Sequence, residues 1–570
     1  MLKSSAWQIS TALVLLILAM LLMPWGLYPR EWRVQYDQWF GARGYEAPDP
    51  TVAPERVPVD VEVCPPDFNG WRDAATIADV DVAASEVCEP DDPNAVAAFV
   101  KGTNNVSEHL LMSSRLAPDA VVKGRDLDGD GDPDEIHLKL EVMELNGASP
   151  DIPLPIAQFE IAPGVTPGLW VFAPKSIGMS TENFESNIAQ PGLRLPSPVI
   201  RVEQGDRVRI TLENTHYMPH TVHLHGVDHP FVDDGGEGND GVPTTSEVPI
   251  MPGASRTYEL QPRQPGTNYY HCHVQPQAHV MMGLQGLFIV EENRPNNWVQ
   301  SFNVGAGQVR HRSVASKELY DREYDIHYQD LDADLNNRIQ ESNDPRVISR
   351  LVNREFDASQ AQPEYATMNG RSFPYTFRDA LIVTRPDERL KLRVLNGGST
   401  GIALHTHGHK VKITHYDGVM QAEAAQIVRD VIWIATAQRV DLDVRTKNDG
   451  LHSYGEGIWL LHDHQPKGVV TDGTGPGGNV SAIVYESYLR EDGWPKTLGV
   501  DLRSYFDPAY YQRKIPVWRS YDPDSRFEDI DPTTSDAVLL AVAAVLAGFA
   551  LGLLGHGVFR MFVRRQPSDR

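Results

Sequence analysis

Short segments in which apolar and polar residues alternate recur along the middle of the chain. Residues 199–202 and 208–212 alternate in this way on either side of Gly205-Asp206, a pattern typical of a β-hairpin. The same alternation returns at residues 389–395, just before Asn396-Gly397. Each alternating segment is followed by a His-x-His pair and, some tens of residues later, by a second such pair. The sequence therefore predicts two related β-domains.

Two long apolar stretches lie near the ends of the chain, at residues 6–27 and 537–559. At ~1.5 Å per residue of helix, each is long enough to cross a hydrocarbon core of ~30 Å. A secretory signal is the alternative for the first stretch, but residues 23–27 contain no small-residue cleavage site, which favours an uncleaved transmembrane anchor. Arginines after the second stretch indicate a cytoplasmic carboxyl end, although Arg30 and Arg33 weakly oppose the matching orientation of the first. We therefore expect a membrane-embedded protein with an extracytoplasmic body, in the periplasm or at the cell surface.

Composition narrows the class of protein further. The net charge of −26 repels phosphate backbones, so we expect no nucleic-acid partner. The 42 prolines and 45 glycines favour many turns and short strands, which predicts an all-β fold. Only three cysteines are present, so neither a disulfide-dense scaffold nor a thiolate-rich metal site is possible. Metal chemistry in this chain must depend mainly on its 20 histidines.

The predicted division of the chain follows these changes in pattern. The predicted parts are an amino-terminal anchor at 6–27, an acidic extracytoplasmic region at 50–150, a first β-domain at 155–293, a second at 294–490 and a carboxy-terminal transmembrane helix at 537–559. Cys64 and Cys88 lie together in the acidic region and are able to form a disulfide in an oxidising compartment, which leaves Cys272 unpaired.

The acidic region contains a run of carboxylates at alternate positions around glycines, formed by Asp126, Asp128, Asp130, Asp132 and Asp134. This run is similar to an EF-like calcium loop, in which oxygen ligands gather on a sharp glycine turn. The twelfth position is a histidine and not the bidentate glutamate of a full EF-hand. Calcium binding and a solvated acidic turn are therefore both open interpretations.

Four His-x-His pairs carry the main chemical signal. Residues i and i+2 of a strand point to the same side, so each pair directs two imidazoles toward one place. The pairs are His223 with His225, His271 with His273, His405 with His407, and His462 with His464. Eight imidazoles suffice for three copper ions. His220, Cys272 and His279 remain outside these pairs. Two histidines with one cysteine are the ligand set of a blue-copper centre.

Other histidines have simpler explanations, because a single histidine on a strand is more often a core or surface residue than a ligand. That interpretation is given to His216, His229, His409 and His415. Zinc is disfavoured, since the paired clusters do not form one closed tetrahedral set.

Taken together, these motifs resemble the multicopper oxidases over roughly residues 155–490. The similarity extends to residues 240–243, 249–253 and 266–271, which look like the laccase segment between its first two copper motifs. The resemblance implies two cupredoxin-like Greek-key β-barrels, here preceded by a small β-rich region and flanked by a transmembrane helix at each end.

The resemblance also implies roles for individual residues. His223 and His405 would hold the type 2 copper, and His220, Cys272 and His279 the type 1 copper. The type 3 pair would be held by His225, His271, His273, His407, His462 and His464, giving about four coppers per chain.

The axial position of the type 1 centre and the proton donor follow less directly from the resemblance. The axial position falls on Leu284, which cannot ligate, while Met281 and Met282 are alternatives. Asp240 would supply protons, although a turn-capping aspartate before glycine is the competing interpretation.

The position of the cysteine motif predicts the assembly. The motif lies in the first β-domain, and Asp463 stands at the matching place in the second. The chain therefore resembles two-domain members that form homotrimers, in which each trinuclear copper site is shared between neighbouring subunits. Insertions leave open a site formed within one chain.

The implied activity is one-electron oxidation of a reductant coupled to four-electron reduction of dioxygen to water. The reductant would be phenol-like, a metal ion or a redox protein. A copper nitrite reductase is the alternative enzyme, but it leaves unexplained His273, His407, His462 and His464. A non-catalytic copper or electron-transfer protein would require only the three type 1 ligands.

Overall fold

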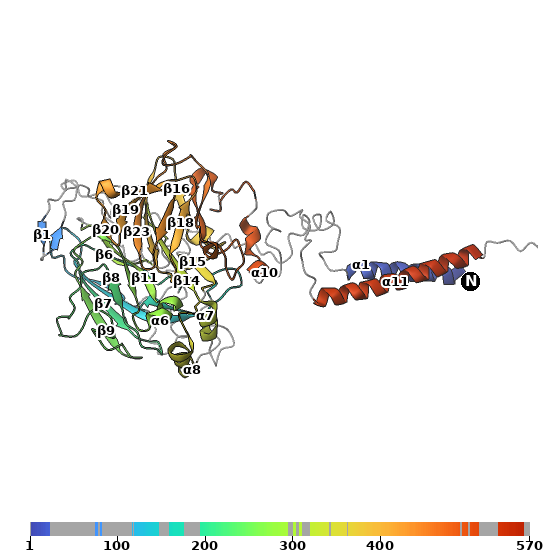
Figure 1. Ribbon diagram of the computed structural model, residues 1–570, viewed down its shortest axis with the longest axis horizontal. Coiled ribbons are helices and arrows are strands. Elements are labelled where there is room, and N and C mark those ends of the chain that lie inside the picture. Colours follow the sequence, from blue (N-terminus) through green and yellow to red (C-terminus); the bar gives the residue numbers. More distant parts are fainter. Residues whose placement is uncertain are drawn as a thin grey trace, which may run out of the picture. The chain divides into compact units, whose positions relative to one another are not determined.

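The computed structural model describes the chain in segments that include most of its β-rich body (Figure 1). The described residues are 2–22, 75–77, 80–82, 117, 119–147, 159–175, 194–293, 300–303, 307–310, 320–340, 344–361, 363–490, 493–499, 502–511 and 534–563. The chain divides into two units, one formed by residues 47–498 and one by residues 1–46 with 499–570. Strands dominate the larger unit, which confirms the predicted β fold. Cys64 and Cys88 lie outside the described residues, so the predicted disulfide is not addressed.

The first part of the body is built from two five-stranded sheets. One has the order β3-β4-β7-β9, with β5 paired to β4, and the other has the order β12-β6-β11-β10-β8. Their strands are β3 (Val121–Lys123), β4 (Glu135–Leu145), β5 (Leu169–Pro174), β6 (Val199–Glu203), β7 (Arg207–Glu213), β8 (His223–His225), β9 (Ser255–Leu260), β10 (Gly266–His271), β11 (Gln285–Glu291) and β12 (Ser301–Asn303). Helix α6 (Pro276–Met282) connects β10 to β11. We call this part the first sandwich.

The second part repeats the plan. An eight-stranded sheet has the order β13-β14-β17-β23-β19-β20, with β15 on β14 and β21 on β19, and it faces a five-stranded sheet of order β16-β25-β24-β18-β22. Their strands are β13 (Gly307–Arg310), β14 (Arg322–Leu331), β15 (Tyr365–Met368), β16 (Ile382–Thr384), β17 (Arg389–Asn396), β18 (Ile402–Thr406), β19 (Val411–Tyr416), β20 (Val419–Met420), β21 (Ile427–Arg429), β22 (Val431–Ile434), β23 (Arg439–Arg445), β24 (Ile458–Asp463) and β25 (Val480–Tyr485). We call this part the second sandwich.

Short helices and one separate hairpin complete the body. They are β1 (Ala75–Ile77) with β2 (Val80–Val82), α7 (Ala333–Gln340), α8 (Pro345–Arg350), η3 (Leu351–Glu355), α9 (Thr376–Asp379), η4 (Glu423–Ala425), η5 (Pro466–Val469) and η6 (Glu486–Tyr488). Side chains from α7, α8 and η3 join the apolar core of the first sandwich, although these elements follow β14 of the second.

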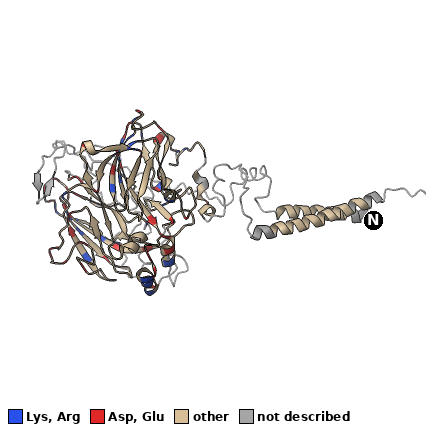
Figure 2. Ribbon diagram, in the orientation of Figure 1, with Lys and Arg blue, Asp and Glu red and all other residues tan. Residues whose placement is uncertain are grey.

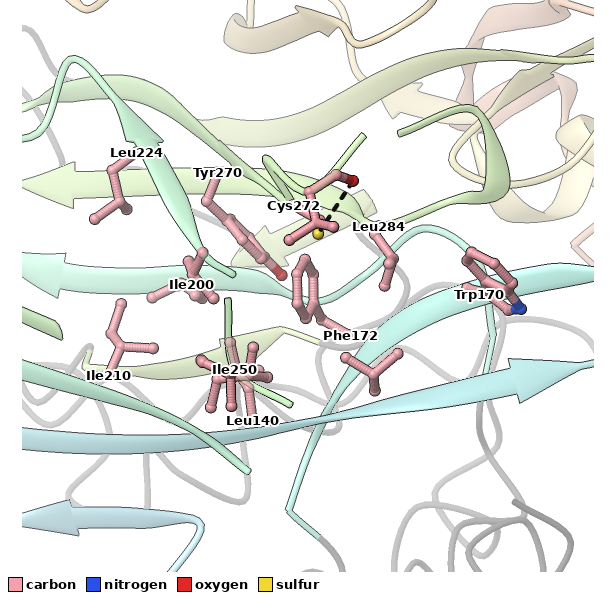
Figure 3. Packing of buried hydrophobic residues seen from close by; sticks show 14 of the residues in the cluster. Leu140, Trp170, Phe172, Ile200, Ile210, Leu224, Ile250, Tyr270, Cys272 and Leu284 are labelled. Carbon is pink, nitrogen blue, oxygen red and sulfur yellow. Dashed lines mark hydrogen bonds between the residues drawn. The ribbon is translucent and has the colours of Figure 1, made fainter. Parts of the chain in front are cut away.

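One apolar core fills each sandwich, because each sheet directs alternate side chains inward. The first core contains Leu140 and Phe172 from one sheet and Ile200 and Tyr270 from the other. Figure 3 shows this packing, with Cys272 among the same buried side chains. A sulfur atom that is part of a core is shielded from water, which bears on its chemistry below.

Several polar side chains of β6 and β17 are buried, whereas Arg207 and Arg209 of β7 are exposed. Arg201 of β6 contacts Glu323 and Asp325 of β14, and Arg393 of β17 also contacts Glu323. These side chains are almost fully buried where the sandwiches meet. Buried charges need partners, so this ion-pair network matches the two sandwiches to each other.

Strands on both sides of the predicted boundary at residue 150 belong to one sheet. Strands β3 and β4, which the sequence prediction assigned to a separate acidic region, belong to the same sheet as β7 and β9. The Asp-rich loop therefore connects two strands of the first sandwich. Strand β12 also pairs with β6, so the first sandwich extends past residue 293.

In the described residues of the smaller unit there are two long helices and two short ones, α1 (Leu2–Leu21), η7 (Leu502–Phe506), α10 (Pro508–Tyr511) and α11 (Thr534–Val563). Helices α1 and α11 lie side by side (Figure 1), with the buried Ala12 and Ala19 on α1 and Ala543 and Ala550 on α11. Among the described residues, one segment, Leu539–His556, is long and apolar enough to cross a membrane, while Trp7–Leu21 is a shorter apolar helix. In Figure 2 the ribbon of these two segments is tan, the colour of residues other than Lys, Arg, Asp and Glu.

Candidate metal centres

His220, Cys272 and His279 come together at one end of the first core, and we call this group the thiolate centre. Nδ1 of His220 lies 3.6 Å from Sγ of Cys272, and Nδ1 of His279 lies 3.4 Å from the same sulfur. All three residues have an exposed fraction of 0%. Two nitrogens and one thiolate sulfur within 4.8 Å of one another form the donor set of a copper electron-transfer site. The donor chemistry therefore fits copper.

Backbone hydrogen bonds fix these three side chains. The residue after β10, Cys272, donates its N–H to the carbonyl of Leu284 at 3.0 Å, and Leu284 donates to the carbonyl of His279 at 3.1 Å. His220 forms an isolated bridge with Ile250, with N···O distances of 3.1 and 2.9 Å. Cys272 thus directly follows β10, His279 lies on helix α6, and His220 is held by an isolated bridge.

In the absence of a metal ion, burial determines the protonation of the thiolate centre. It raises the pKa of the Cys272 thiol to about 12 and lowers the pKa of His279 to about 3. The imidazole is therefore neutral at physiological pH, and the thiolate needs a bound cation to be stabilised. A metal ion supplies that positive charge.

Aromatic rings that the sequence did not single out as functional surround the thiolate centre. His216, interpreted from sequence as an ordinary core or surface histidine, has its Nδ1 2.8 Å from Nε2 of His220. Trp170 meets the rings of His220 and His279 edge-on, at centroid distances of 6.2 and 5.2 Å. The only sign of this contact in the sequence is the i, i+4 spacing of His216 and His220. Such spacing brings side chains together on a helix, and these two residues do not lie on one.

The side chains suggested for the axial position are all buried. Leu284 is fully buried within the same core cluster as Cys272, and Figure 3 shows both side chains in one close-up. Sδ of Met282 lies 3.5 Å from Nδ2 of Asn336, so this thioether already has a polar contact. Met281 lines a cavity of about 300 Å³ together with His271.

A first group of imidazoles lies at the edge of the first sandwich, on β8 and at the end of β10. Nε2 of His225 lies 3.0 Å from Nε2 of His271, and ligand atoms of His223 lie within 4.8 Å of both. The ring of His273 lies 5.0 Å from that of His223. His223 and His271 each donate Nδ1–H to a backbone carbonyl, of Asp240 at 2.6 Å and of Cys272 at 2.9 Å, which leaves their Nε2 lone pairs for a metal.

A second group of imidazoles repeats this arrangement on β18 and β24. Nε2 of His407 lies 3.1 Å from Nε2 of His462, and ligand atoms of His405 lie within 4.8 Å of both. The ring of His464 lies 5.5 Å from that of His462. His405 and His462 donate Nδ1–H to the carbonyls of Asp430 and Asp463, at 2.8 Å each. Among the described residues of one chain, no ring contact joins this group to the first.

Burial favours the neutral, metal-binding form of at least two imidazoles in each group. It lowers the pKa of His225 to about 4 and that of His271 to about 3, and it lowers the pKa of His407 and His462 as well. The second group is more open to solvent than the first, since His464 is exposed and the other three rings are half-buried. The second group therefore lies at the edge of a sheet where another molecule can reach it.

Asp240 lies beside the first imidazole group. Its Oδ1 is 3.4 Å from Nδ1 of His223 and 3.2 Å from Nε2 of His229. His229 in turn donates Nδ1–H to the carbonyl of Val227 at 2.9 Å. The carboxylate is half-buried, and it therefore connects the first imidazole group with the surface.

The two sandwiches carry equivalent positions in equivalent hydrogen bonds. Nδ2 of Asn214 donates to the carbonyls of Met218 and Ile250, and Nδ2 of Asn396 donates to those of Thr400 and Ile434. Counting from these asparagines places Ile402 where the first sandwich has His220. With Asp463 at the place of Cys272 and no histidine in residues 465–490, the second sandwich lacks all three donors of a thiolate centre.

The Asp-rich loop between β3 and β4 gathers three of its five carboxylates. Ligand oxygens of Asp126, Asp128 and Asp134 lie within 4.8 Å of one another. Oδ2 of Asp134 accepts the N–H groups of Leu127 and Asp128, at 2.5 and 3.2 Å. Asp130 and Asp132 stand outside this group. His137, at the twelfth position, contacts Thr211 instead, with Nε2 2.8 Å from Oγ1.

Comparisons with known proteins show similarity to multicopper oxidases. Residues 183–295 match the family profile described as Multicopper oxidase. The iron transport multicopper oxidase FET3 of Gibberella zeae is 28% identical over 256 residues, covering 45% of this chain and 35% of that protein. Copper resistance protein A of Pseudomonas syringae pv. tomato is 24% identical over 270 residues, covering 44% and 41%. The matches thus span well under half the length of these curated relatives.

Solved structures similar to this chain include a blue copper oxidase from Nitrosomonas europaea, which is 23% identical in sequence. The match covers 69% of this chain and 95% of that one, with a TM-score of 0.44. The structure of Fet3p, described as a multicopper oxidase that functions in iron import, has 19% identity, coverage of 64% and 55%, and a TM-score of 0.42.

A β-sheet body that brings a Cys-His₂ centre beside paired imidazole groups defines a copper protein. The profile match over residues 183–295, which contain β6 to β11 of the first sandwich, makes this part of the chain similar to the multicopper oxidase family.

Proposed function

We propose that this protein is an oxidase that takes single electrons from a reductant and reduces dioxygen to water. Copper bound at these sites would supply one-electron oxidation at the thiolate centre and four-electron reduction of dioxygen at a trinuclear site. The reductant we propose is a small molecule of phenol-like character, a metal ion or a redox protein. Both sandwiches would be cupredoxin-like barrels.

Cys272 is the single observation that carries this proposal. It lies between His271 and His273 in the chain, and its sulfur contacts His220 and His279. The thiolate centre is therefore covalently joined to two imidazoles of the first group. A copper nitrite reductase or an electron carrier would leave the second imidazole group without a purpose.

Within this site each residue has a defined task. His220, Cys272 and His279 would hold the type 1 copper, with Leu284 at a non-ligating axial position, and His223 and His405 would hold the type 2 copper. The type 3 pair would be held by His225, His271, His273, His407, His462 and His464. Asp240 would deliver protons to the first imidazole group, since its carboxylate reaches both His223 and His229.

The metal content tests this proposal directly. Full-length protein loaded with copper should contain about four coppers per chain, with a paramagnetic type 1 signal, a type 2 signal and a spin-silent pair. It should consume oxygen when supplied with phenols or reducing metal ions. About two coppers per chain together with nitrite reduction would favour the reductase instead, and one copper without oxygen uptake would favour an electron carrier.

We further propose that the trinuclear site forms between copies of the chain in a homotrimer. Each chain presents one half-site on each sandwich, and a head-to-tail contact would join the first group of one copy to the second group of the next. Such heterologous contacts close into a ring of three when each copy is rotated by one third of a turn relative to the next. Exposed apolar residues on β20, β21 and β22 support this contact, and β22 pairs with β18, which carries His405. These exposed residues are Val419, Met420, Ile427, Val428, Val431 and Trp433, which we call the second-sandwich surface.

A mixing experiment distinguishes shared from intrachain sites. His223→Ala removes the first half-site, and His405→Ala removes the second, so each pure variant should be inactive. In a head-to-tail ring, coexpression of the two variants in equal amounts should restore roughly one quarter of the sites, because an intact site needs one half from each variant. Coexpression without any recovery would indicate that both halves come from one chain.

Membrane attachment is also part of the proposal. Helix α11 contains a segment long enough to span a bilayer, and the apolar α1 packs beside it. The arginines that follow α11 favour a cytoplasmic carboxyl end. The body would then lie outside the cytoplasm, and a fused reporter enzyme at each end of the chain would test this orientation.

We propose that calcium binds between β3 and β4 through Asp126, Asp128 and Asp134. The support is the approach of three carboxylates within 4.8 Å, in a loop whose N–H groups already orient Asp126 and Asp134. Oxygen ligands on a tight turn suit calcium. Calorimetric titration of the full chain with calcium, and of the Asp126→Asn variant, tests this site.

A further inference from the structure

The ring of His216 contacts the thiolate centre from outside the ligand set. Its Nδ1 lies 2.8 Å from Nε2 of His220, and both rings are buried. On its other edge, His220 directs Nδ1 toward Sγ of Cys272, 3.6 Å away. The ring of His220 therefore contacts the Cys272 sulfur with Nδ1 and the His216 imidazole with Nε2.

The contact between two imidazoles allows two neutral arrangements. In one, Nε2 of His220 carries the proton and donates it to Nδ1 of His216, so Nδ1 of His220 keeps a free lone pair. In the other, His216 donates and the proton of His220 is on Nδ1, facing Cys272. A metal ligand nitrogen must be unprotonated, so only the first arrangement permits binding beside the cysteine.

The surroundings of His216 hold its ring in place. Its backbone N–H donates to Oδ1 of Asn214 at 3.0 Å. Tyr217 packs against its ring at a centroid distance of 3.9 Å, and Trp170 meets it edge-on at 4.9 Å. A ring packed on two sides does not rotate freely, and it therefore offers its Nδ1 to His220 in a constant direction.

The second sandwich provides an internal comparison. Gly398 donates its N–H to Oδ1 of Asn396 at 3.0 Å, as His216 does to Asn214. The position that carries an imidazole in the first sandwich therefore carries no side chain in the second, where Ile402 and Asp463 replace two of the donors. The extra ring accompanies the sandwich that has the thiolate centre.

His220 also differs from the imidazoles described above. His223, His271, His405 and His462 each donate their second nitrogen to a backbone carbonyl. His220 is paired with a side chain instead, and that contact can be removed by substitution. Partners of this kind orient metal ligands and affect the affinity of the site.

We propose that His216 is a positioning residue of the thiolate centre, which accepts the Nε2–H of His220 and keeps the Nδ1 lone pair of that ligand directed at a metal beside Cys272. This role rests on the proposed type 1 centre and deepens it. It requires no copper ligation by His216 itself.

Two variants of the full chain test the role. His216→Leu removes the acceptor and keeps an apolar side chain, whereas His216→Asn retains a side-chain acceptor close to the position of Nδ1. Copper affinity of the thiolate centre, measured by competition titration of metal-free protein and followed by the blue absorption, should fall by roughly 10- to 100-fold in His216→Leu. His216→Asn should recover most of this loss and restore the position of the absorption band.

A matched control separates this role from a general loss of packing. His409 is also buried, and its Nε2 lies 3.1 Å from the Tyr485 hydroxyl in the second sandwich. His409→Leu should therefore leave the blue absorption and the affinity of the thiolate centre unchanged. Unchanged affinity and absorption in His216→Leu would overturn the role, as would equal impairment of His216→Leu and His216→Asn.

A direct measurement covers the case in which His216→Leu fails to fold. In wild-type protein labelled with ¹⁵N-histidine and loaded with Cu(I), nitrogen chemical shifts should show His220 protonated at Nε2 and His216 unprotonated at Nδ1. The opposite assignment would overturn the role. A wild-type chain that binds no copper at Cys272 would instead overturn the proposed centre, so the two failures are distinguishable.

Discussion

Asp463 occupies in the second sandwich the backbone position that Cys272 occupies in the first. Each lies between two histidines, and each accepts Nδ1–H of the preceding histidine at its carbonyl, at 2.8 and 2.9 Å. Cys272 donates its N–H to Leu284 and Asp463 donates to Asn479. The same strand geometry therefore ends in a cysteine in one sandwich and in an aspartate in the other, so the cysteine of the His-Cys-His donor set belongs to the first sandwich.

The first prediction concerns this pair. Cys272→Ser should abolish the blue absorption and reduce oxidation of the donor to background, because the sulfur is the sole thiolate donor of the centre. Asp463→Cys should not create a second blue centre, since Ile402 stands at the place of His220. Absorption spectra of both copper-loaded variants check this. Blue absorption that survives in Cys272→Ser would show that the assignment of the centre is wrong.

The second prediction concerns the axial position. If Leu284 faces the metal without ligating, Leu284→Met should add a weak thioether donor and lower the reduction potential of the centre by several tens of millivolts. The volume is nearly conserved, so the fold should tolerate the change. Potentiometric titration of the blue absorption measures the shift, with Leu287→Met, at another fully buried leucine, as control. An unchanged potential, together with a rise in Met281→Leu or Met282→Leu, would assign the axial position to that methionine.

The third prediction concerns the assembly. Trp433 is 60% exposed on the second-sandwich surface, and Val431 of the same strand β22 is also exposed. If this surface is covered by a neighbouring copy, the double variant Trp433→Glu with Val431→Glu should weaken association by about tenfold or more, since burying either apolar side chain is worth ~1.5–3 kcal/mol. Light scattering of detergent-solubilised full chain measures the association.

The control for the assembly prediction is Val347→Glu, at an exposed valine on α8 outside this surface. It should leave the assembly intact. The blue absorption should persist in all these variants, because the thiolate centre lies wholly within the first sandwich. A trimer that persists in the double variant would place the interface elsewhere.

Which side chains come together could largely be predicted from sequence, because strand geometry relates His-x-His pairs directly to side-chain direction. The thiolate set also required few assumptions, since Cys272 and His279 are close in sequence and lie on one hairpin connection. The role of His216 was missed, because its partner becomes visible only when the loop before β8 folds against Trp170. The extent of the first sandwich was also missed: the acidic loop at 126–134 obscured the fact that β4 pairs with β7, a contact between segments far apart in the chain.

The last prediction concerns the Asp-rich loop. Burial, assisted by the nearby charges of Asp128 and Asp126, raises the pKa of Asp134 to about 6, while its ordinary value is 3.8. Because the folded value lies above the unfolded one, the stabilising effect of protonated Asp134 is present below pH 3.8 and is lost as the pH rises through about 6. Above that pH the buried carboxylate is ionised, and a bound cation offsets its cost.

Calcium should therefore raise the midpoint of thermal unfolding of the body at pH 7 by several degrees at 100-fold excess over its dissociation constant, where linkage gives about 2.7 kcal/mol. The increase should shrink as the pH is lowered from 6 to 4, because protons then compete for the same oxygens. Differential scanning calorimetry with calcium or a chelator measures it, in wild type and in Asp134→Asn. Asp344→Asn removes a carboxylate at the start of α8 and should keep the full calcium response. An equal calcium response in wild type and Asp134→Asn would contradict the site. A calcium response that does not change between pH 4 and pH 7 would also contradict it. Either result would show that the effect of calcium does not depend on ionisation of the buried aspartate.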